Sequence, residues 1–387
     1  MKKILIAYAT AGIGHKKASM AVKAALDETA AQGPTQVSII DALDYTNAFF
    51  KWSYLKAYLL MVNKLPTFWG LAYYITDNRY VDILISFIRR VNNWINSRKL
   101  ERYLAEVRPD VVISTHFFVS EVVSDLKKRG LCRSRLITVV TDYRLHSWWV
   151  ADHTDMYVVG GEDAKKDLLS WQVPEEKIRV LGIPVEPVFS KRLDTTAILE
   201  KSGLREDKFT ILIVGGGFGV GPIEDIIKIA GNISEKVQII AVCGHNENLV
   251  KRLEALKPGL KADLKILGFV DNVYEYMEVA EVLISKSGGI TTSESLAKEL
   301  PLIVIAPIIG QETRNCDFLI DHRAALRLKN VGELRGVLED LHSHPEKLRE
   351  LTEAIRLIKK PNACYDVAKL ALDLAADRVG LAADRVG

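Results

Sequence analysis

The first stretch that could do chemistry is "TAGIGHKKAS" at residues 10–19, which follows an apolar run and precedes a helical pattern. Its glycine spacing fits neither the P-loop pattern nor the dinucleotide pattern, because Lys17 stands where the third glycine of the latter belongs. What remains is a tight turn at Gly12 and Gly14 that places His15 at the start of a helix. The positive helix end disfavours imidazolium and favours a neutral base. The alternative is a structural histidine that caps its own turn.

A glycine-rich loop in the second half is a better candidate for binding phosphate. The run "ILIVGGGFGVGP" at 211–222 is an apolar strand followed by Gly215, Gly216, Gly217, Gly219 and Gly221, and then by Pro222. Backbone N–H groups in such a loop, with a helix start behind them, suit a diphosphate. The alternative is a flexible turn without a ligand.

A third set of polar residues lies at two further strand-to-helix turns, within residues 283–315. The first turn has two glycines, two threonines and an acid placed for a ribose diol; the second has an amide and an acid suited to sugar hydroxyls. In order these residues are Gly288, Gly289, Thr291, Thr292, Glu294, Gln311 and Glu312. Individually each is an ordinary helix-capping residue. Together, at successive strand ends of one sheet, they predict a nucleotide-sugar pocket.

A fourth stretch, "VVTDYRLHSWWVADH" at 139–153, follows a strand of the first half. It places Asp142 and His146 just beyond the strand, with Trp148 and Trp149 following. Polar residues at the carboxyl end of a parallel strand occupy the edge where ligands bind. The alternative is a loop that its tryptophans pack in place.

The elements that must position these residues alternate between apolar strands and amphipathic helices. The expected strands are residues 2–10, 36–41, 109–115, 135–141, 155–161, 209–217, 237–244, 264–270, 281–289 and 301–307. Continuous Val, Ile and Leu runs indicate parallel strands covered on both faces. The sequence therefore predicts an α/β fold of two doubly wound domains. The prolines in "GIPVEPVFSKRL" mark a boundary between residues 1–187 and 188–361, and a helix from about residue 362 could pack back on the first domain.

One segment, residues 47–108, lacks an evident strand. It holds 13 of the chain's 30 aromatic residues and ten Lys and Arg against four acids. Aromatic and basic residues at helical spacing are typical of helices that lie on an anionic membrane surface. An ordinary helical insert with aromatic core faces is the alternative, and the pattern alone does not separate the two.

The overall composition excludes several classes of protein. A net charge of +3 on 387 residues gives no indication of nucleic-acid binding, and no apolar run is long enough for a membrane span. The four cysteines stand apart, without metal-ligand spacing, and the start of the chain lacks the features of a signal peptide. We expect a cytoplasmic protein without a cofactor or a metal site.

Six motifs occur in an order that resembles glycosyltransferase family 28, in its branch of diacylglycerol glucosyl- and galactosyltransferases. They are Gly12-x-Gly14-His15, "TDYRLHSWW", "LGIPV", "LGFV", "SGGITTSES" and "GQETRN", and they span nearly the whole chain. The resemblance implies the GT-B fold, in which two Rossmann-like domains face a central cleft. It also implies metal-independent, inverting transfer of a hexose from a UDP-sugar to a lipid acceptor, diacylglycerol, at the cytoplasmic face of the cell membrane.

The resemblance also assigns roles to residues. The loop containing Gly216, Gly217 and Gly219 would face the donor diphosphate. The backbone near Phe269 and Val270 would meet uracil, Glu294 the ribose, and Gln311 and Glu312 the sugar. Gly288, Gly289 and Thr291 would also belong to the UDP-sugar site. His15 would be the catalytic base with Asp142 as its rival, while Gly14, His146 and Trp148 would lie on the acceptor side. A polyprenyl-linked acceptor, a non-catalytic UDP-sugar sensor and a sugar-nucleotide epimerase remain alternatives.

Overall fold

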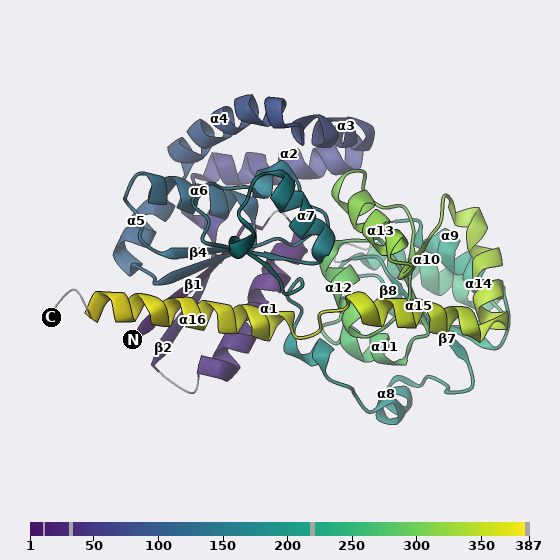
Figure 1. Cartoon of the computed structure of the whole chain (residues 1–387). Coiled ribbons are helices and arrows are strands. Elements are labelled where there is room, and N and C mark those ends of the chain that lie inside the picture. Colours follow the sequence, from purple (N-terminus) through teal and green to yellow (C-terminus); the bar gives the residue numbers. More distant parts are fainter. Residues whose placement is uncertain (11, 31–33, 217–220, 384–387) are drawn as a thin grey trace. The chain divides into compact units, whose positions relative to one another are not determined.

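The chain divides into two compact units in the computed structural model, which describes residues 1–10, 12–30, 34–216 and 221–383 (Figure 1). The first unit comprises Met1–Pro187, Ile309–Gln311 and Lys360–Gly387, and the second comprises Val188–Ile308 and Glu312–Lys359. Each unit contains a six-stranded sheet in which all paired strands are parallel.

The sheet of the first unit has the order β2-β1-β3-β4-β5-β6. Its strands are β1 (Lys2–Tyr8), β2 (Thr35–Asp41), β3 (Val111–Ser114), β4 (Arg135–Val139), β5 (Met156–Val159) and β6 (Ile178–Val180). Its helices are α1 (Ile13–Ala30), α2 (Ala48–Lys64), α3 (Pro66–Thr76), α4 (Arg79–Asn96), α5 (Arg98–Val107), α6 (Phe117–Lys128), α7 (Glu162–Ser170) and α16 (Ala363–Ala383).

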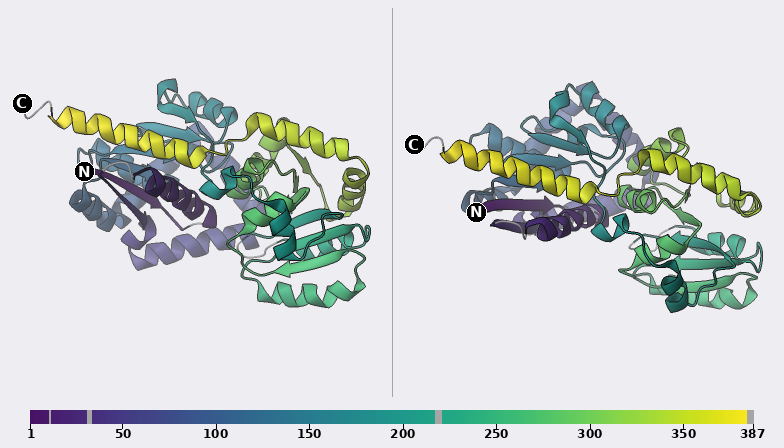
Figure 2. Two further views of the ribbon diagram at one scale, coloured as in Figure 1. Left: turned by 90° about the horizontal axis from the view of Figure 1, so that it is seen from below. Right: turned by 60° about the horizontal axis from the view of Figure 1, so that its bottom comes forward.

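The two faces of this sheet are covered by different helices because side chains alternate along each strand. Ile4 and Ile6 of β1 lie in a cluster with α1 and α16, whereas Leu5 and Ala7 lie in a cluster with α5 and α6. All four side chains are at most 1% exposed. Figure 2 shows α16, the last helix of the chain, beside α1 at the start.

The sheet of the second unit has the order β12-β11-β10-β7-β8-β9. Its strands are β7 (Phe209–Val214), β8 (Val237–Val242), β9 (Asp263–Leu267), β10 (Val282–Ser285), β11 (Leu302–Val304) and β12 (Ala325–Arg327). Its helices are α8 (Thr195–Ser202), α9 (Ile223–Ala230), α10 (Glu247–Leu256), α11 (Val273–Val279), α12 (Gly289–Ala297), α13 (Gln311–Asp321), α14 (Leu334–Ser343) and α15 (Pro345–Ile358).

The sequence pattern predicted ten of these strands and missed two, β6 and β12. Each has three residues and is an edge strand of its sheet, and only its first residue is buried. An edge strand this short has no continuous apolar run from which periodicity could be read. The doubly wound architecture itself is as predicted.

Residues 47–108 fold as the helices α2 to α5, as their pattern indicated. The inner side of α4 is fixed by a buried polar contact to α6. Glu121 accepts hydrogen bonds from Arg89 Nε at 2.9 Å and from Asn93 Nδ2 at 2.6 Å. Because Arg89 and Asn93 are one helical turn apart, they fix which side of α4 faces inward. No helix in the described ranges has the length and apolarity that crossing a bilayer requires.

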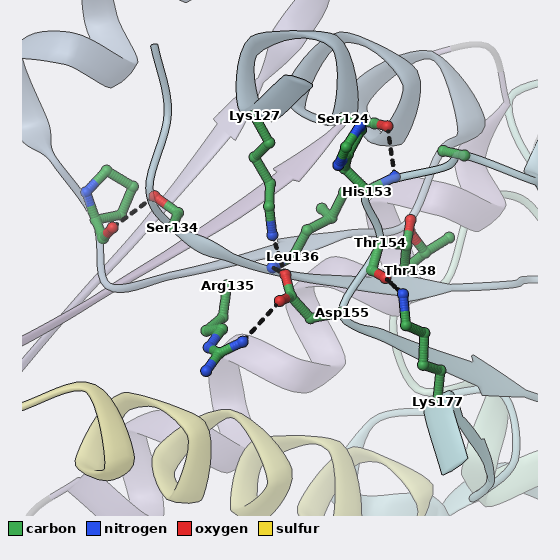
Figure 3. Close-up of polar contacts among 12 residues, drawn as sticks. Ser124, Lys127, Ser134, Arg135, Leu136, Thr138, His153, Thr154, Asp155 and Lys177 are labelled. Atoms are coloured by element: carbon green, nitrogen blue, oxygen red, sulfur yellow. Dashed lines mark hydrogen bonds and ion pairs between the residues drawn. The ribbon is translucent and has the colours of Figure 1, made fainter. Parts of the chain in front are cut away.

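A second polar cluster joins β4 and β5 at the amino ends of these strands (Figure 3). Asp155 accepts hydrogen bonds from the Leu136 N–H at 2.7 Å and Arg135 Nη1 at 2.9 Å, and it pairs with Lys127 of α6. Burial alone would raise the pKa of Asp155, but the Lys127 ammonium and the other donors hold it below its usual value of 3.8.

We therefore expect Asp155→Asn to lower the free energy of unfolding by about 2 kcal/mol at pH 7, because it removes a paired buried charge. The folded-state pKa lies below the unfolded value, so the contribution is present above about pH 4 and lost as the pH falls through the folded pKa. Urea unfolding at pH 7 and pH 3 measures both effects. Equal stability of variant and wild type at pH 7 would contradict this assignment.

Candidate functional site

His15 lies at the topological switch point of the first sheet. The chain leaves β1 toward β2 on one side, and β3 pairs with β1 on the other. In such sheets the crevice for ligands opens at the carboxyl ends of the two central strands. His15 follows β1 in the first turn of α1, and Thr115 follows β3 directly. The fold therefore brings together residues 100 positions apart in the sequence.

The hydrogen bonds of His15 define its tautomer. Its Nδ1 lies 2.7 Å from the Thr115 carbonyl oxygen and 3.1 Å from Thr141 Oγ1. A carbonyl oxygen only accepts, so Nδ1 carries the proton and Nε2 keeps its lone pair. Thr115 Oγ1 also donates to the His15 carbonyl at 2.9 Å, which fixes the first turn of α1 to the end of β3.

Two aromatic rings lie beside the imidazole of His15, a residue that is half-buried. The ring of His116 lies 4.5 Å away at an interplanar angle of 68°, and that of Trp149 lies 6.1 Å away. Burial lowers the pKa of His15 to about 4, although the hydrogen bond to Thr115 acts in the opposite direction. At neutral pH the imidazole is uncharged, with a fixed tautomer and Nε2 able to accept a proton. This is the arrangement that a general base requires.

The other predicted residues of the first unit lie around this point with different roles. Gly14 is half-buried in the first turn of α1, and Asp142 is half-buried next to Thr141. His146 uses both ring nitrogens within the protein: Nε2 donates to the Tyr73 carbonyl at 2.9 Å, and Nδ1 accepts the Trp148 N–H at 3.2 Å. The bond to Tyr73 connects the loop of His146 to α3.

Trp148 packs within an aromatic group formed by α3, α6 and its own turn. Its ring lies 4.3 Å from that of His146 and 5.4 Å from that of Phe117. Its Nε1 is buried and makes no hydrogen bond to any described residue. Phe117 in turn lies 4.3 Å from His116, so a row of rings runs from Trp148 to His15.

The second sheet has its switch point between β7 and β10. Gly216 follows β7 with a φ of +70°, a conformation that favours glycine. The predicted glycines Gly217 and Gly219 lie outside the described residues. Ser285 Oγ donates to the Val214 carbonyl at 2.8 Å and ties the carboxyl ends of the two strands together.

The turn after β10 leads directly into α12. Gly288 is the N-cap residue, and the helix starts at Gly289. Thr291 is half-buried on this helix, and Glu294 is 4% exposed. Thr292 is fully buried, and its hydroxyl makes no hydrogen bond to any described residue. A helix start of this kind is able to bind an anion, because its first N–H groups have no partner within the helix.

Glu312 lies against this turn from α13, while Gln311 is the half-buried first residue of the same helix. Glu312 Oε2 accepts the Ile308 N–H at 2.7 Å, and Ser287 Oγ donates to the Glu312 carbonyl at 2.6 Å. Burial raises the pKa of Glu312, and the charge of Lys286 acts against that shift. Lys286 therefore places a cation near the same turn.

Phe269 and Val270 follow β9. The Phe269 side chain is 59% exposed, and its ring stacks on that of His245 at 4.5 Å and 8°. His245 follows β8 and lines an open hollow of about 370 Å³ with Asn246, Glu247 and Asn248.

Several candidate residues were not among those predicted from the sequence: Thr115, His116, Thr141, Lys286 and His245. Each follows the carboxyl end of a strand, which is the signal that could have indicated them. What the sequence does not give is which strand ends are adjacent.

Comparison with known proteins identifies both halves. Residues 15–185 match the family model for monogalactosyldiacylglycerol (MGDG) synthase, and residues 210–366 match the glycosyltransferase family 28 C-terminal domain. A processive diacylglycerol beta-glucosyltransferase of Bacillus mycoides is 30% identical over 93% of this chain and 90% of its own length. Its counterpart in Bacillus licheniformis is 28% identical over 94% of this chain and 92% of its own length.

Solved structures with the same fold include MurG of Acinetobacter baumannii, with a TM-score of 0.62 and 15% identity over 96% of this chain and 100% of that one. Another is MnaA of S. aureus with UDP, with a TM-score of 0.65 and 13% identity over 97% and 98%. HepE of Anabaena in complex with UDP-glucose has a TM-score of 0.55 and 12% identity over 98% of this chain and 100% of that one. The chain thus has the GT-B fold and belongs to glycosyltransferase family 28, in the group whose first half is the MGDG synthase domain, and it is a glycosyltransferase.

Proposed function

We propose that this enzyme transfers a hexose from a UDP-sugar to the free hydroxyl of diacylglycerol, with inversion at the anomeric carbon and without a metal ion. The observation that carries the proposal is the neutral His15 with its proton fixed on Nδ1. The family assignment and the names of the relatives, which are diacylglycerol glucosyltransferases, support the acceptor.

In the proposed reaction, Nε2 of His15 takes the proton of the lipid hydroxyl as that oxygen attacks the anomeric carbon. The bond from this carbon to the diphosphate oxygen breaks, and UDP leaves with the electron pair. The imidazolium that forms is stabilised by its Nδ1–H donating to the Thr115 carbonyl. Asp142 lies next to Thr141 and is the second candidate for the base.

The second unit would hold the donor. The glycine loop with Gly216, the start of α12 at Gly288 and Gly289, and Lys286 together supply N–H groups and a cation for the leaving diphosphate. Uracil would lie near Phe269 and Val270, the ribose at Glu294, and the sugar at Gln311 and Glu312. One oxygen of the buried Glu312 carboxyl accepts the Ile308 N–H in the loop before α13, which orients the group.

We further propose that α2 to α4 hold the enzyme on the cytoplasmic face of the membrane. The outer side of α4 carries Phe87, Ile88, Val91, Trp94 and Ile95, all exposed, and we refer to these five as the α4 apolar face. Their spacing places them on one side of the helix, away from Arg89 and Asn93. The Arg98 guanidinium lies 5.3 Å from the Trp94 ring, a combination that suits an anionic lipid surface.

For this face, the double variant Phe87→Ser/Trp94→Ser should bind vesicles containing anionic lipid at least about tenfold more weakly, since each aromatic ring loses on the order of 1 kcal/mol of burial. Vesicle co-sedimentation measures the change. Leu357→Ser removes an isolated side chain that is 87% exposed on α15, so it serves as the control and should bind as wild type. Unchanged binding of the double variant would exclude the α4 apolar face as the contact.

The reaction is tested by UDP release from UDP-glucose and UDP-galactose, each with diacylglycerol vesicles, with a polyprenyl-linked acceptor and with vesicles lacking either. Release that depends on diacylglycerol and persists in EDTA is expected. Release only with the polyprenyl acceptor contradicts the assigned substrate, and loss of release in EDTA contradicts the metal-free mechanism. UDP-sugar binding without release would indicate a sensor, and sugar interconversion without an acceptor would indicate an epimerase.

A further inference from the structure

The imidazole next to His15 belongs to His116, which the proposed reaction does not use. His116 follows Thr115 at the end of β3, is 1% exposed, and packs edge-to-face with His15 at 4.5 Å. A second imidazole this close to a base affects it directly, because the base becomes a cation during the reaction.

The protonation state of His116 is fixed by the helix that it caps. It is the N-cap residue of α6, and its Nδ1 accepts the Phe118 N–H at 3.1 Å. Nδ1 therefore has no proton, and the neutral ring carries its proton on Nε2. Protonation of Nδ1 would remove the cap and would place a charge on a side chain that is 1% exposed.

Because the two rings are in contact, they cannot both be charged at low cost. Burial and then the charge of His15 hold the pKa of His116 well below its ordinary value. The Tyr54 ring lies 6.2 Å from that of His116, and the Trp149 ring lies beside His15. The charged side chains nearest in the sequence are those of Lys16 and Lys17 in α1 and of Asp142, which follows Thr141. For His15 itself, burial lowers the pKa and the hydrogen bond to the Thr115 carbonyl raises it.

We propose that His116 is a positioning residue for His15. Its neutral imidazole, fixed in place as the N-cap of α6, holds the His15 ring against the Thr115 carbonyl and excludes water and a second charge from that side. The proposal rests on His15 being the base. His116 would thus have two roles: its Nδ1 atom caps α6, and its ring packs on that of His15.

Two substitutions separate these roles. His116→Asn keeps an acceptor for the Phe118 N–H, because asparagine is among the best N-cap residues, but it removes the ring. His116→Phe keeps a ring and loses the cap, which should lower the Tm by a few degrees. The two measurements are the titration of His15 by NMR of ¹⁵N-labelled histidines and the pH profile of kcat.

In His116→Asn we expect the titration midpoint of His15 to rise from about 4 toward 6.5, kcat to fall at least about tenfold, and the acid limb of its profile to move to higher pH. In His116→Phe we expect the midpoint to stay near 4 while the Tm falls. A His15 midpoint that His116→Asn leaves unchanged, or that both variants shift equally, overturns the proposal.

The NMR titration keeps this test separate from the proposed function. If His15 proves not to be the base, a variant without His15 stays active, yet the midpoint of His15 in the two His116 variants still reports whether the rings are coupled. If His15 is the base but His116 has no part in holding it, activity depends on His15 and the midpoint does not move.

Discussion

Replacement of His15 by Asn should lower kcat by a factor of about 10² to 10⁴, the usual contribution of a general base. The asparagine amide can still donate to the Thr115 carbonyl, which His15 Nδ1 contacts at 2.7 Å, so the first turn of α1 should stay in place. What is lost is the Nε2 lone pair that accepts the proton. Steady-state kinetics with a UDP-sugar and diacylglycerol vesicles measures the loss.

The effect should fall on kcat, with the KM for the UDP-sugar changed by no more than about threefold, because all of the proposed donor contacts except Gln311 lie in the second unit. Asp142→Asn is the matched comparison, since Asp142 is the rival base and lies next to Thr141. If Asp142→Asn lost activity and His15→Asn kept it, the base would be the carboxylate.

The pH dependence of wild-type kcat/KM follows from the same residue. Because the pKa of His15 is lowered to about 4, the ring is neutral and able to accept a proton above that pH. We expect an acid limb near pH 4 and no loss of activity between pH 5 and pH 7. A limb near 6.5, the ordinary value for histidine, would show that the site is wetter than its burial indicates.

The second large effect is expected at the start of α12, where Gly288→Asp should lower kcat/KM for the UDP-sugar about a hundredfold. A carboxylate a few ångströms from a diphosphate costs on the order of 3 kcal/mol at an effective dielectric constant near 20. The backbone accepts the change, since Gly288 has φ −65° and ψ 140° and an added Cβ would lie 3.7 Å from Glu312 Oε1.

Gly288→Asn is the matched control because it has the same shape without the charge, and both residues are good N-caps. Its kcat/KM should stay within about threefold of wild type. Direct titration with UDP separates donor binding from catalysis. Equal UDP affinity for the two variants would place the diphosphate away from this helix start.

The fold was largely predictable because each strand and helix is indicated by the pattern of its own residues. Near-continuous apolar runs predicted ten of the twelve strands and their parallel arrangement, whereas β6 and β12 are too short to show a period. The neighbours of His15 were not predictable in the same way. Thr115, His116 and Thr141 are ordinary residues at the ends of β3 and β4, and they become a site only because the strand order places β3 against β1.

The candidate donor site shows the same limit. Gly288, Gly289 and Glu312 were predicted from strand-to-helix turns, and the structure places Glu312 against the turn at Gly288. Lys286 was not singled out, because a lysine before two glycines has no motif of its own. Its significance follows from its electrostatic effect on Glu312, which depends on the packing of the first turn of α13 against the turn after β10.

The most direct test of the central claim, a single displacement by a lipid hydroxyl that His15 deprotonates, is the anomeric configuration of the glycolipid product. The enzyme is given UDP-α-hexose labelled with ¹³C at the anomeric carbon together with diacylglycerol vesicles, and the extracted lipid is examined by NMR. We expect a β-linked hexose on the diacylglycerol hydroxyl, formed by wild type and nearly absent with His15→Asn. An α-linked product, or the same yield of β-linked product from His15→Asn, would contradict it.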